Sequence, residues 1–241
     1  MKTAKKITKK IDLMQTGTIF KYQQLNITPS EYSAATKAIE RLITKGIVKR
    51  VSTGLFYKPI ITVFGELRPR EAELIKSYLF EKNNRIAYIT GTALYNRMGL
   101  TTQVPNTIKL ACRSKRISIN TENVQAKPVK SYIDVTNDNY YLLEILDALK
   151  DFTKIPDLDK NAAIKYLLNK LTKLTEKDKS RIIKFSLFYP PRTRAFLGAL
   201  FDKKNHKQSV TICKQSLNPL SMYKLGIKED ILSTAPNWNI L

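Results

Sequence analysis

The chain has 241 residues, enough for one large domain or two small ones, and its 43% hydrophobic and 26% charged residues are typical of a folded globular protein. Lysine and arginine number 42 against 20 acidic residues. The formal net charge of +22 favours a polyanionic partner, nucleic acid first and an anionic membrane surface second. A single histidine and two cysteines exclude a disulfide framework and a four-cysteine zinc site, and they argue against catalysis by histidine pairs.

The N-terminal segment is basic and lacks the uninterrupted apolar stretch of a signal peptide. The longest apolar runs are strand-length, as in Ile60–Phe64, and none approaches the ~20 residues that a membrane span needs. We therefore expect a cytoplasmic protein without membrane association, in which Cys112 is a reduced core residue.

The first predicted element is a helix over Lys2–Met14. Its apolar residues recur every three or four positions and so share one face, while lysines occupy the rest; they are Ala4, Ile7, Ile11 and Met14. Gly17 ends this helix. An extended piece over Thr18–Phe20 and a short helix over Tyr22–Asn26 follow.

The next predicted helix begins at Thr28, which can cap it, with Pro29 at the first helical position and Glu31 completing a capping box. The helix runs to Lys45 and ends at Gly46. Its apolar stripe consists of Ala35, Ala38, Ile39, Leu42 and Ile43.

After Gly46 the pattern changes to that of a hairpin, with strands over Ile47–Val51 and Leu55–Tyr57 joined by a turn at Ser52–Gly54. Three helices followed by a basic hairpin are the order of a winged helix-turn-helix. Residues 1–58 contain 12 basic and 3 acidic side chains, a net charge of +9. We therefore predict a DNA-binding domain over residues 1–59; the alternative is a small solvated domain with no such role.

DNA recognition in the major groove needs short polar or basic side chains on the outward, N-terminal half of a helix. Basic side chains farther along that helix and on the hairpin suit phosphate. These criteria select ten candidate DNA-binding residues: Ser30, Ser33, Thr36, Lys37, Arg41, Lys49, Arg50, Ser52, Thr53 and Lys58.

The string KAIERLITKGIVKRVSTGLFYKP, with its Arg41-Leu42, Gly46, Lys49-Arg50 and Gly54-Leu55, resembles the N-terminal winged helix of AbiEi-type antitoxins and related bacterial transcriptional regulators. The resemblance continues downstream over Ala87–Leu110. The matching groups there are Gly91-Thr92-Ala93, Gly99-Leu100-Thr101 and Gln103-Val104-Pro105.

The resemblance implies a protein of two parts. The first would bind double-stranded DNA at the protein's own promoter and repress it. The second would act as the antitoxin of a type IV toxin–antitoxin system, opposing a nucleotidyltransferase-like toxin without requiring a stable complex. Two alternatives remain: a winged-helix regulator without a toxin, whose C-terminal domain senses a ligand or mediates assembly, and an RNA-binding accessory protein.

Residues 60–241 are predicted to form the C-terminal, antitoxin-like domain, so the whole chain is α+β: a winged helix-turn-helix, a mixed α/β part, then mostly helices. We expect a helix over 66–82, a small sheet within 86–135 that includes a hairpin across Arg113–Lys115, helices within 140–201, and a tail over 202–241. In that tail we expect a strand over Ser209–Cys213 and a packed Trp238.

No nucleotide-binding, hydrolase or metalloprotease motif occurs, so we expect no catalytic residues, no metal site and no cofactor. His206 receives no role. A lysine-rich stretch between Lys165 and Lys184 is interpreted as a solvated helical surface, with a second nucleic-acid or toxin-facing surface as the alternative.

Overall fold

The computed structural model describes residues 3–122, 124–204 and 207–241, and its fold is α+β, as expected. The chain divides into two compact units. The N-terminal unit comprises Met1–Asn84 with Asn120–Val124, and the C-terminal unit comprises Arg85–Ile119 with Gln125–Leu241. His206 lies outside the described residues.

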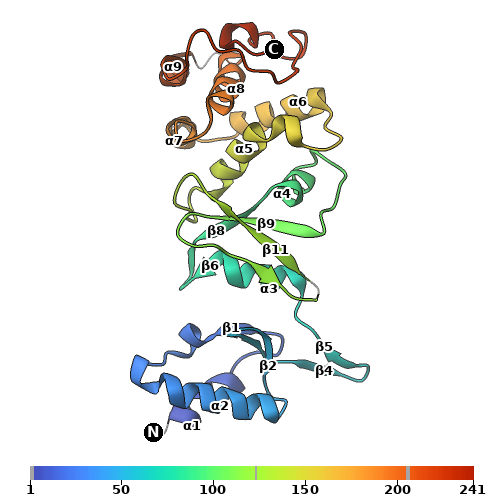
Figure 1. Cartoon of the computed structure of the whole chain (residues 1–241), viewed down its shortest axis with the longest axis vertical. Helices are drawn as coiled ribbons and strands as arrows, with labels where there is room; N and C mark the ends of the chain where they lie inside the picture. Colours follow the sequence, from blue (N-terminus) through green and yellow to red (C-terminus); the bar gives the residue numbers. More distant parts are fainter. Residues whose placement is uncertain (1–2, 123, 205–206) are drawn as a thin grey trace. The chain divides into compact units, whose positions relative to one another are not determined.

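The N-terminal unit begins with helices and a small sheet, labelled in Figure 1. In chain order these are α1 (Thr3–Asp12), β1 (Ile19–Lys21), η1 (Tyr22–Leu25), η2 (Pro29–Glu31), α2 (Tyr32–Thr44), β2 (Lys49–Ser52) and β3 (Leu55–Tyr57). The three strands form an antiparallel sheet in the order β1-β3-β2. The predicted helices and strands of residues 1–58 are thus present within a few residues.

The core of this unit is made by the predicted apolar stripes. Ile7 and Ile11 of α1 and Ile39 of α2 have no exposed surface, and Phe20 and Phe56 of the sheet are 1% exposed. The capping box also forms: the Thr28 backbone N–H and its hydroxyl both donate to Glu31 Oε2 at 3.0 Å. The hydrogen bond from the Thr28 backbone is the main reason that the pKa of Glu31 falls to about 2.

The unit then extends past residue 59 through β4 (Ile60–Thr62), β5 (Gly65–Leu67), α3 (Glu71–Leu79), β6 (Phe80–Glu81) and β7 (Asn84–Arg85). Lys21 Nζ donates to the Ser77 carbonyl at 2.6 Å, and its ammonium lies 5.0 Å from the centre of the Tyr78 ring. Because α3 packs on β1 in this way, the first compact unit ends at Asn84, later than the boundary expected after residue 59.

The predicted helix over 66–82 is wrong at both ends. Glu66 and Leu67 belong to β5, α3 spans Glu71–Leu79, and Phe80 and Glu81 form β6. Pro69 explains the difference at the N-terminal end, since a proline disfavours helical backbone at the residue before it, here Arg68.

The C-terminal unit opens with β8 (Ala87–Thr90) and α4 (Thr92–Arg97), followed by β9 (Thr107–Cys112), β10 (Ile119–Asn120) and β11 (Gln125–Lys130). The sheet order is β10-β11-β9-β8. The hairpin predicted across Arg113–Lys115 is wrong, because β9 pairs antiparallel with β8 and parallel with β11, leaving β10 at the edge.

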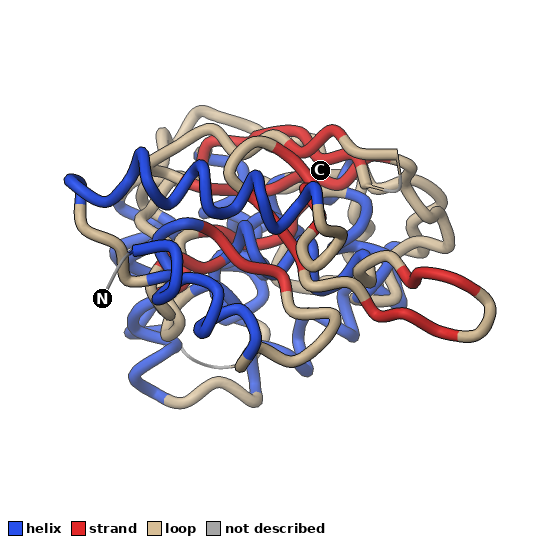
Figure 2. Tube along the Cα trace, turned by 90° about the horizontal axis from the view of Figure 1, so that it is seen from below, coloured by secondary structure: helices blue, strands red, loops and turns tan. Residues whose placement is uncertain are grey.

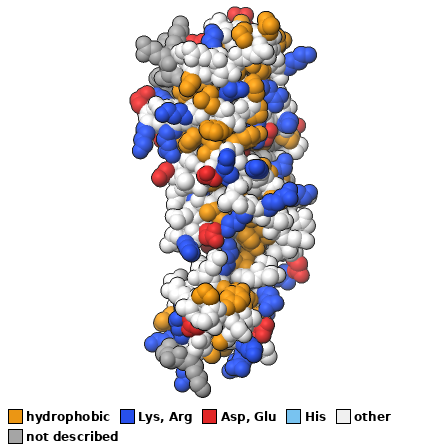
Figure 3. Space-filling model, turned by 60° about the vertical axis from the view of Figure 1, so that its left-hand side comes forward, with side chains coloured by type: hydrophobic (Ala, Val, Ile, Leu, Met, Phe, Trp, Pro, Cys, Tyr) orange, Lys and Arg blue, Asp and Glu red, His pale blue; other side chains and the backbone are white. Residues whose placement is uncertain are grey.

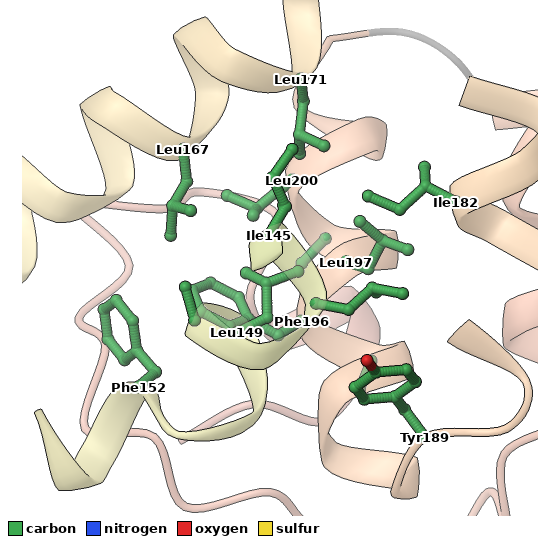
Figure 4. Packing of buried hydrophobic residues seen from close by; sticks show 14 of the residues in the cluster. Ile145, Leu149, Phe152, Leu167, Leu171, Ile182, Tyr189, Phe196, Leu197 and Leu200 are labelled. Carbon is green, nitrogen blue, oxygen red and sulfur yellow. The ribbon is translucent and has the colours of Figure 1, made fainter. Parts of the chain in front are cut away.

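Helices complete this unit: α5 (Tyr140–Lys150), η3 (Phe152–Lys154), α6 (Lys160–Thr172), α7 (Glu176–Ser186), α8 (Pro191–Asp202), α9 (Lys207–Gln215) and η4 (Pro236–Trp238). Every residue of α8 from Ala195 to Phe201 is buried, so α8 is central to the core. Figure 4 shows Phe196, Leu197 and Leu200 among side chains from the surrounding helices. No helix in the described part of the chain is long and apolar enough to cross a membrane.

The strand predicted over Ser209–Cys213 is wrong, because these residues lie in α9. Val210 and Cys213 are both buried, and their separation of three positions places them on one helical face. Cys112 is free and buried, which confirms the expectation for that residue.

Trp238 packs at the C-terminus as expected: it is 3% exposed, and its ring lies directly over Gly198 of α8. A Cβ added at Gly198 would lie 2.2 Å from the ring, closer than any real contact. Glycine is therefore required at this position for Trp238 to pack against α8.

We predict that Gly198→Ala destabilises the protein. Within a helix the change alone would stabilise by up to about 1 kcal/mol, whereas overpacking costs about 1–3 kcal/mol. The clash should dominate, lowering the midpoint of thermal unfolding measured by circular dichroism. An unchanged or raised midpoint would contradict the packing described for Trp238.

Candidate nucleic-acid interface

The outward face of α2 carries a row of polar and basic side chains. Ser33, Lys37 and Arg41 are separated by four positions each and are all exposed, while the opposite stripe of Ala35 and Ile39 has no exposed surface. Ser30, just before the helix, is also exposed. The burial of this stripe therefore determines which side chains of α2 are exposed and can contact a partner.

Thr36 lies at the margin of this face. It is half-buried, and its hydroxyl donates to the Tyr32 carbonyl at 3.0 Å, one turn earlier. The hydroxyl hydrogen is used within the helix, so Thr36 can offer a ligand only its acceptor capacity.

The β2–β3 hairpin exposes two of the predicted DNA-binding residues, Arg50 in β2 and Thr53 in the turn. The Arg50 guanidinium lies 5.8 Å from the centre of the Phe56 ring. Gly54 adopts a φ of +74°, a conformation that side chains disfavour, which explains the glycine in this turn.

Lys49 is held by an ion pair with Glu66 of β5. Glu66 also accepts a hydrogen bond of 2.6 Å from the Tyr57 hydroxyl. The hydrogen bond from Lys49 is the main cause that lowers the pKa of Glu66, and burial followed by the Glu66 contact raises the pKa of Tyr57 to about 12. Much of the Lys49 charge is therefore neutralised within the unit.

Lys58 is predicted to contact DNA, but its side chain is bound within the N-terminal unit. Its ammonium donates to three backbone carbonyls at the end of α1, those of Ile11 at 3.1 Å, Asp12 at 2.8 Å and Met14 at 2.9 Å. A cation at this position satisfies unpaired carbonyls and the negative end of the helix dipole. Lys58 therefore stabilises the N-terminal unit and is not part of the candidate interface.

Ser52 is also engaged internally. It is half-buried, and its hydroxyl forms a hydrogen bond of 3.0 Å with the Tyr78 hydroxyl of α3. The candidate interface that remains consists of exposed residues just before α2, on its outward face and on the β2–β3 hairpin: Ser30, Ser33, Lys37, Arg41, Arg50 and Thr53.

Basic side chains are numerous outside this set. Figure 3 shows more lysine and arginine than acidic side chains on the face it presents. On α1, Lys5 and Lys9 are exposed, and they lie outside the ten predicted DNA-binding residues. The lysine-rich face of the predicted helix over Lys2–Met14 is the sequence signal that identifies them.

The C-terminal unit contains a buried polar cluster around Asp147, which is 2% exposed. Its carboxylate accepts hydrogen bonds from the Tyr88 hydroxyl at 2.9 Å, the Thr90 hydroxyl at 2.6 Å and Lys150 Nζ at 3.0 Å. Burial opposes the charge of Lys150, but the carboxylates of Asp147 and Asp151 outweigh it and raise the pKa of Lys150. The partners of Asp147 are internal, so the cluster ties β8 to α5.

Acidic, histidine and cysteine side chains do not gather into a metal-binding group anywhere in the described residues. In the lysine-rich stretch, Lys179 is buried and paired with Glu176, and Arg181 is paired with Asp178. Lys165, Lys170, Lys173, Lys177 and Lys184 are exposed.

Residues 6–178 match a family of unknown function, DUF6088. The chain belongs to this family. A search of the curated proteins finds no match. Among solved structures, the chain is similar to the RV2827C protein from Mycobacterium tuberculosis, with a TM-score of 0.52 and 10% sequence identity over 99% of this chain and 90% of that one. At this identity the similarity shows that the DUF6088 chain shares a fold with that protein.

We predict that Lys58→Met lowers the free energy of unfolding by about 1 kcal/mol, because charge-assisted hydrogen bonds to the end of α1 are lost at a partly exposed site. Urea denaturation followed by circular dichroism measures the change. Lys45→Met, at an exposed position after α2, is the matched control and should leave stability within about 0.5 kcal/mol. If the two variants have the same free energy of unfolding, Lys58 does not stabilise the end of α1 and remains a candidate for DNA contact.

Proposed function

We propose that this protein is a winged-helix DNA-binding protein that represses its own promoter. The observation that carries the proposal is the outward row of Ser33, Lys37 and Arg41 on α2, backed by a fully buried stripe. A helix with this arrangement can enter the major groove while its apolar face remains in the core.

Other features support the same function. Helix α1, the short helix η1 and the continuous η2–α2 segment precede the β2–β3 hairpin, which is the order of a winged helix. Residues 1–84 contain 16 basic and 7 acidic side chains, a net charge of +9, which suits a phosphate backbone. In this proposal the wing is the β2–β3 hairpin with Arg50 and Thr53, and α2 is the recognition helix.

The exposed residues divide by position. Ser30, Ser33 and Lys37 lie at the N-terminal half of α2, where side chains reach base edges in a recognition helix. Arg41 lies one turn later, and Arg50 lies on the hairpin, where phosphate is the nearer partner. Base contacts discriminate between sequences, whereas phosphate contacts add affinity to any sequence.

We further propose that the C-terminal unit opposes a nucleotidyltransferase-like toxin, and this part rests on the resemblance to AbiEi-type antitoxins. Two glycines of the resembling segment, Gly91 and Gly99, lie at the two ends of α4 with φ values of +70° and +71°. Both turns require this backbone conformation. The matching pattern therefore supports a shared fold more directly than a shared activity.

We predict that Lys37→Ala narrows the difference in affinity between promoter DNA and a scrambled duplex, because a base contact is worth about 1–3 kcal/mol of discrimination. Arg50→Ala should weaken both complexes about equally and reduce the log–log salt slope by about one. Fluorescence anisotropy at several salt concentrations measures both, with thermal unfolding to verify that each variant is folded. If Lys37→Ala lowers the affinity for both duplexes equally, α2 does not distinguish between DNA sequences.

We predict that the two proposed roles separate in the full-length chain. Lys37→Ala should abolish repression of the promoter in a reporter strain, yet still restore growth when a cognate nucleotidyltransferase-like toxin is expressed. The substitution lies in the N-terminal unit and leaves every residue of the proposed antitoxin unit unchanged. Failure of the wild-type chain to restore growth would refute the antitoxin role without affecting DNA binding.

A further inference from the structure

The hairpin formed by β4 and β5 carries an apolar tip in solvent. The strands pair antiparallel, with Ile60 opposite Leu67 and Thr62 opposite Gly65, so Val63 and Phe64 form the two-residue turn. Val63 is 94% exposed and Phe64 is 97% exposed. Figure 2 shows this hairpin projecting from its unit, at the right of the view.

The hairpin has a defined shape up to the turn. The Thr62 hydroxyl donates to the Gly65 carbonyl at 2.8 Å, and the Phe64 backbone N–H donates to the same hydroxyl at 3.3 Å. At the base, the Ile60 side chain packs over Gly17, where an added Cβ would lie 2.9 Å from it. Glu66 is held by Tyr57 and Lys49. The two apolar side chains are thus presented on a short, anchored β-ribbon.

Nothing in the packing of the unit requires these two side chains. Two-residue hairpin turns favour Asn, Asp and Gly, whose backbones suit the turn and whose side chains suit water. Val63 and Phe64 gain almost no burial from folding, so their apolar surface is available for a partner.

The size of this surface argues against a second copy of the chain. An aromatic side chain buries about 150–250 Å², so Val63 and Phe64 with the exposed Ile61 and Leu67 of the same hairpin offer a few hundred Å². A stable protein interface needs about 800 Å² on each partner. A wedge between stacked bases needs only one or two apolar side chains, because phosphate contacts supply the remaining affinity.

Charge favours duplex DNA as the partner. From Ile60 to Leu67 the hairpin has one charged side chain, Glu66, and this carboxylate is paired with Lys49. The tip therefore presents no free negative charge to phosphates, on a unit whose 16 basic and 8 acidic side chains give a net charge of +8. The polar outward face of α2 belongs to the same unit and is suited to base edges, a feature that a lipid surface would not use.

We propose that the β4–β5 hairpin is a wedge that inserts Phe64, supported by Val63, between stacked base pairs of the bound duplex from the minor groove. The inference rests on the proposed DNA-binding function and adds to it a bend in the DNA. Apolar side chains that enter a base step in this way unstack it and kink the duplex toward the major groove. The protein would then recognise its promoter partly because one base-pair step there is easily deformed.

The test uses the full-length Phe64→Trp variant. The single native tryptophan, Trp238, is 3% exposed, so acrylamide quenching reports mainly on the introduced indole. We expect that indole to be readily quenched in the free protein. Binding of promoter duplex should reduce its accessibility several-fold and also quench its emission through stacking on bases. Anionic phospholipid vesicles are tested in parallel.

A second measurement follows the bend, by energy transfer between dyes at the two ends of the duplex. Phe64→Ala should abolish the bend and weaken binding about tenfold, as expected for loss of one stacked aromatic side chain. Phe188→Ala is the matched control, since Phe188 is 63% exposed in the C-terminal unit. It should change neither quantity.

The outcomes separate the wedge from DNA binding itself. If anisotropy shows the duplex bound while the introduced indole stays accessible and the DNA straight, the wedge is wrong and the proposed function stands. If no duplex is bound at low salt, both are wrong. Protection by vesicles but not by duplex would identify a lipid contact instead. Protection that rises with protein concentration alone would identify a second copy of the chain, and either result overturns the wedge.

Discussion

The burial of one stripe of α2 is the constraint on which the rest of the N-terminal unit depends. Ala35 and Ile39 have no exposed surface, and Ala38 and Leu42 are at most 5% exposed, against a core supplied by α1 and the three-stranded sheet. Rotating the helix to expose a different face would remove these side chains from the core. The identity of the outward residues is therefore a consequence of hydrophobic burial, which is stronger than any preference of the polar residues themselves.

The excess of positive charge has two different uses. Lys58 completes the end of α1, Lys49 is paired with Glu66, and Lys6 donates to the Asn26 carbonyl while lying 3.6 Å from Glu31. These cations stabilise the unit. Lys37, Arg41 and Arg50 are exposed, and they represent the charge that a polyanion can meet. The net charge therefore overstates the charge available to a polyanionic partner, because several lysines are bound to carbonyls or carboxylates within the unit.

Much of the N-terminal unit could be predicted from the sequence, because its signals are local. Capping residues, glycine stops and three-to-four spacing each involve neighbours within a few positions, and the helices and strands of residues 1–58 agree with them. The errors involve distant partners. Lys58 bonds to Ile11, and Ser52 bonds to Tyr78, contacts that no local pattern contains. The apolar residues Val210 and Cys213 predict a strand, although their spacing equally fits the helix α9 that packs against α7 and α8. The exposure of Phe64 likewise depends on the tertiary structure, because an apolar run alone predicts burial.

The most direct test of the proposed function is a hydroxyl-radical footprint of the full-length chain on the DNA upstream of its own gene, at physiological salt. We expect one or more protected segments about one helical turn in length, at the same position in the presence of excess random duplex. Protection that is spread evenly along the fragment, or that random duplex removes, would contradict the assignment of α2 as a sequence-reading helix.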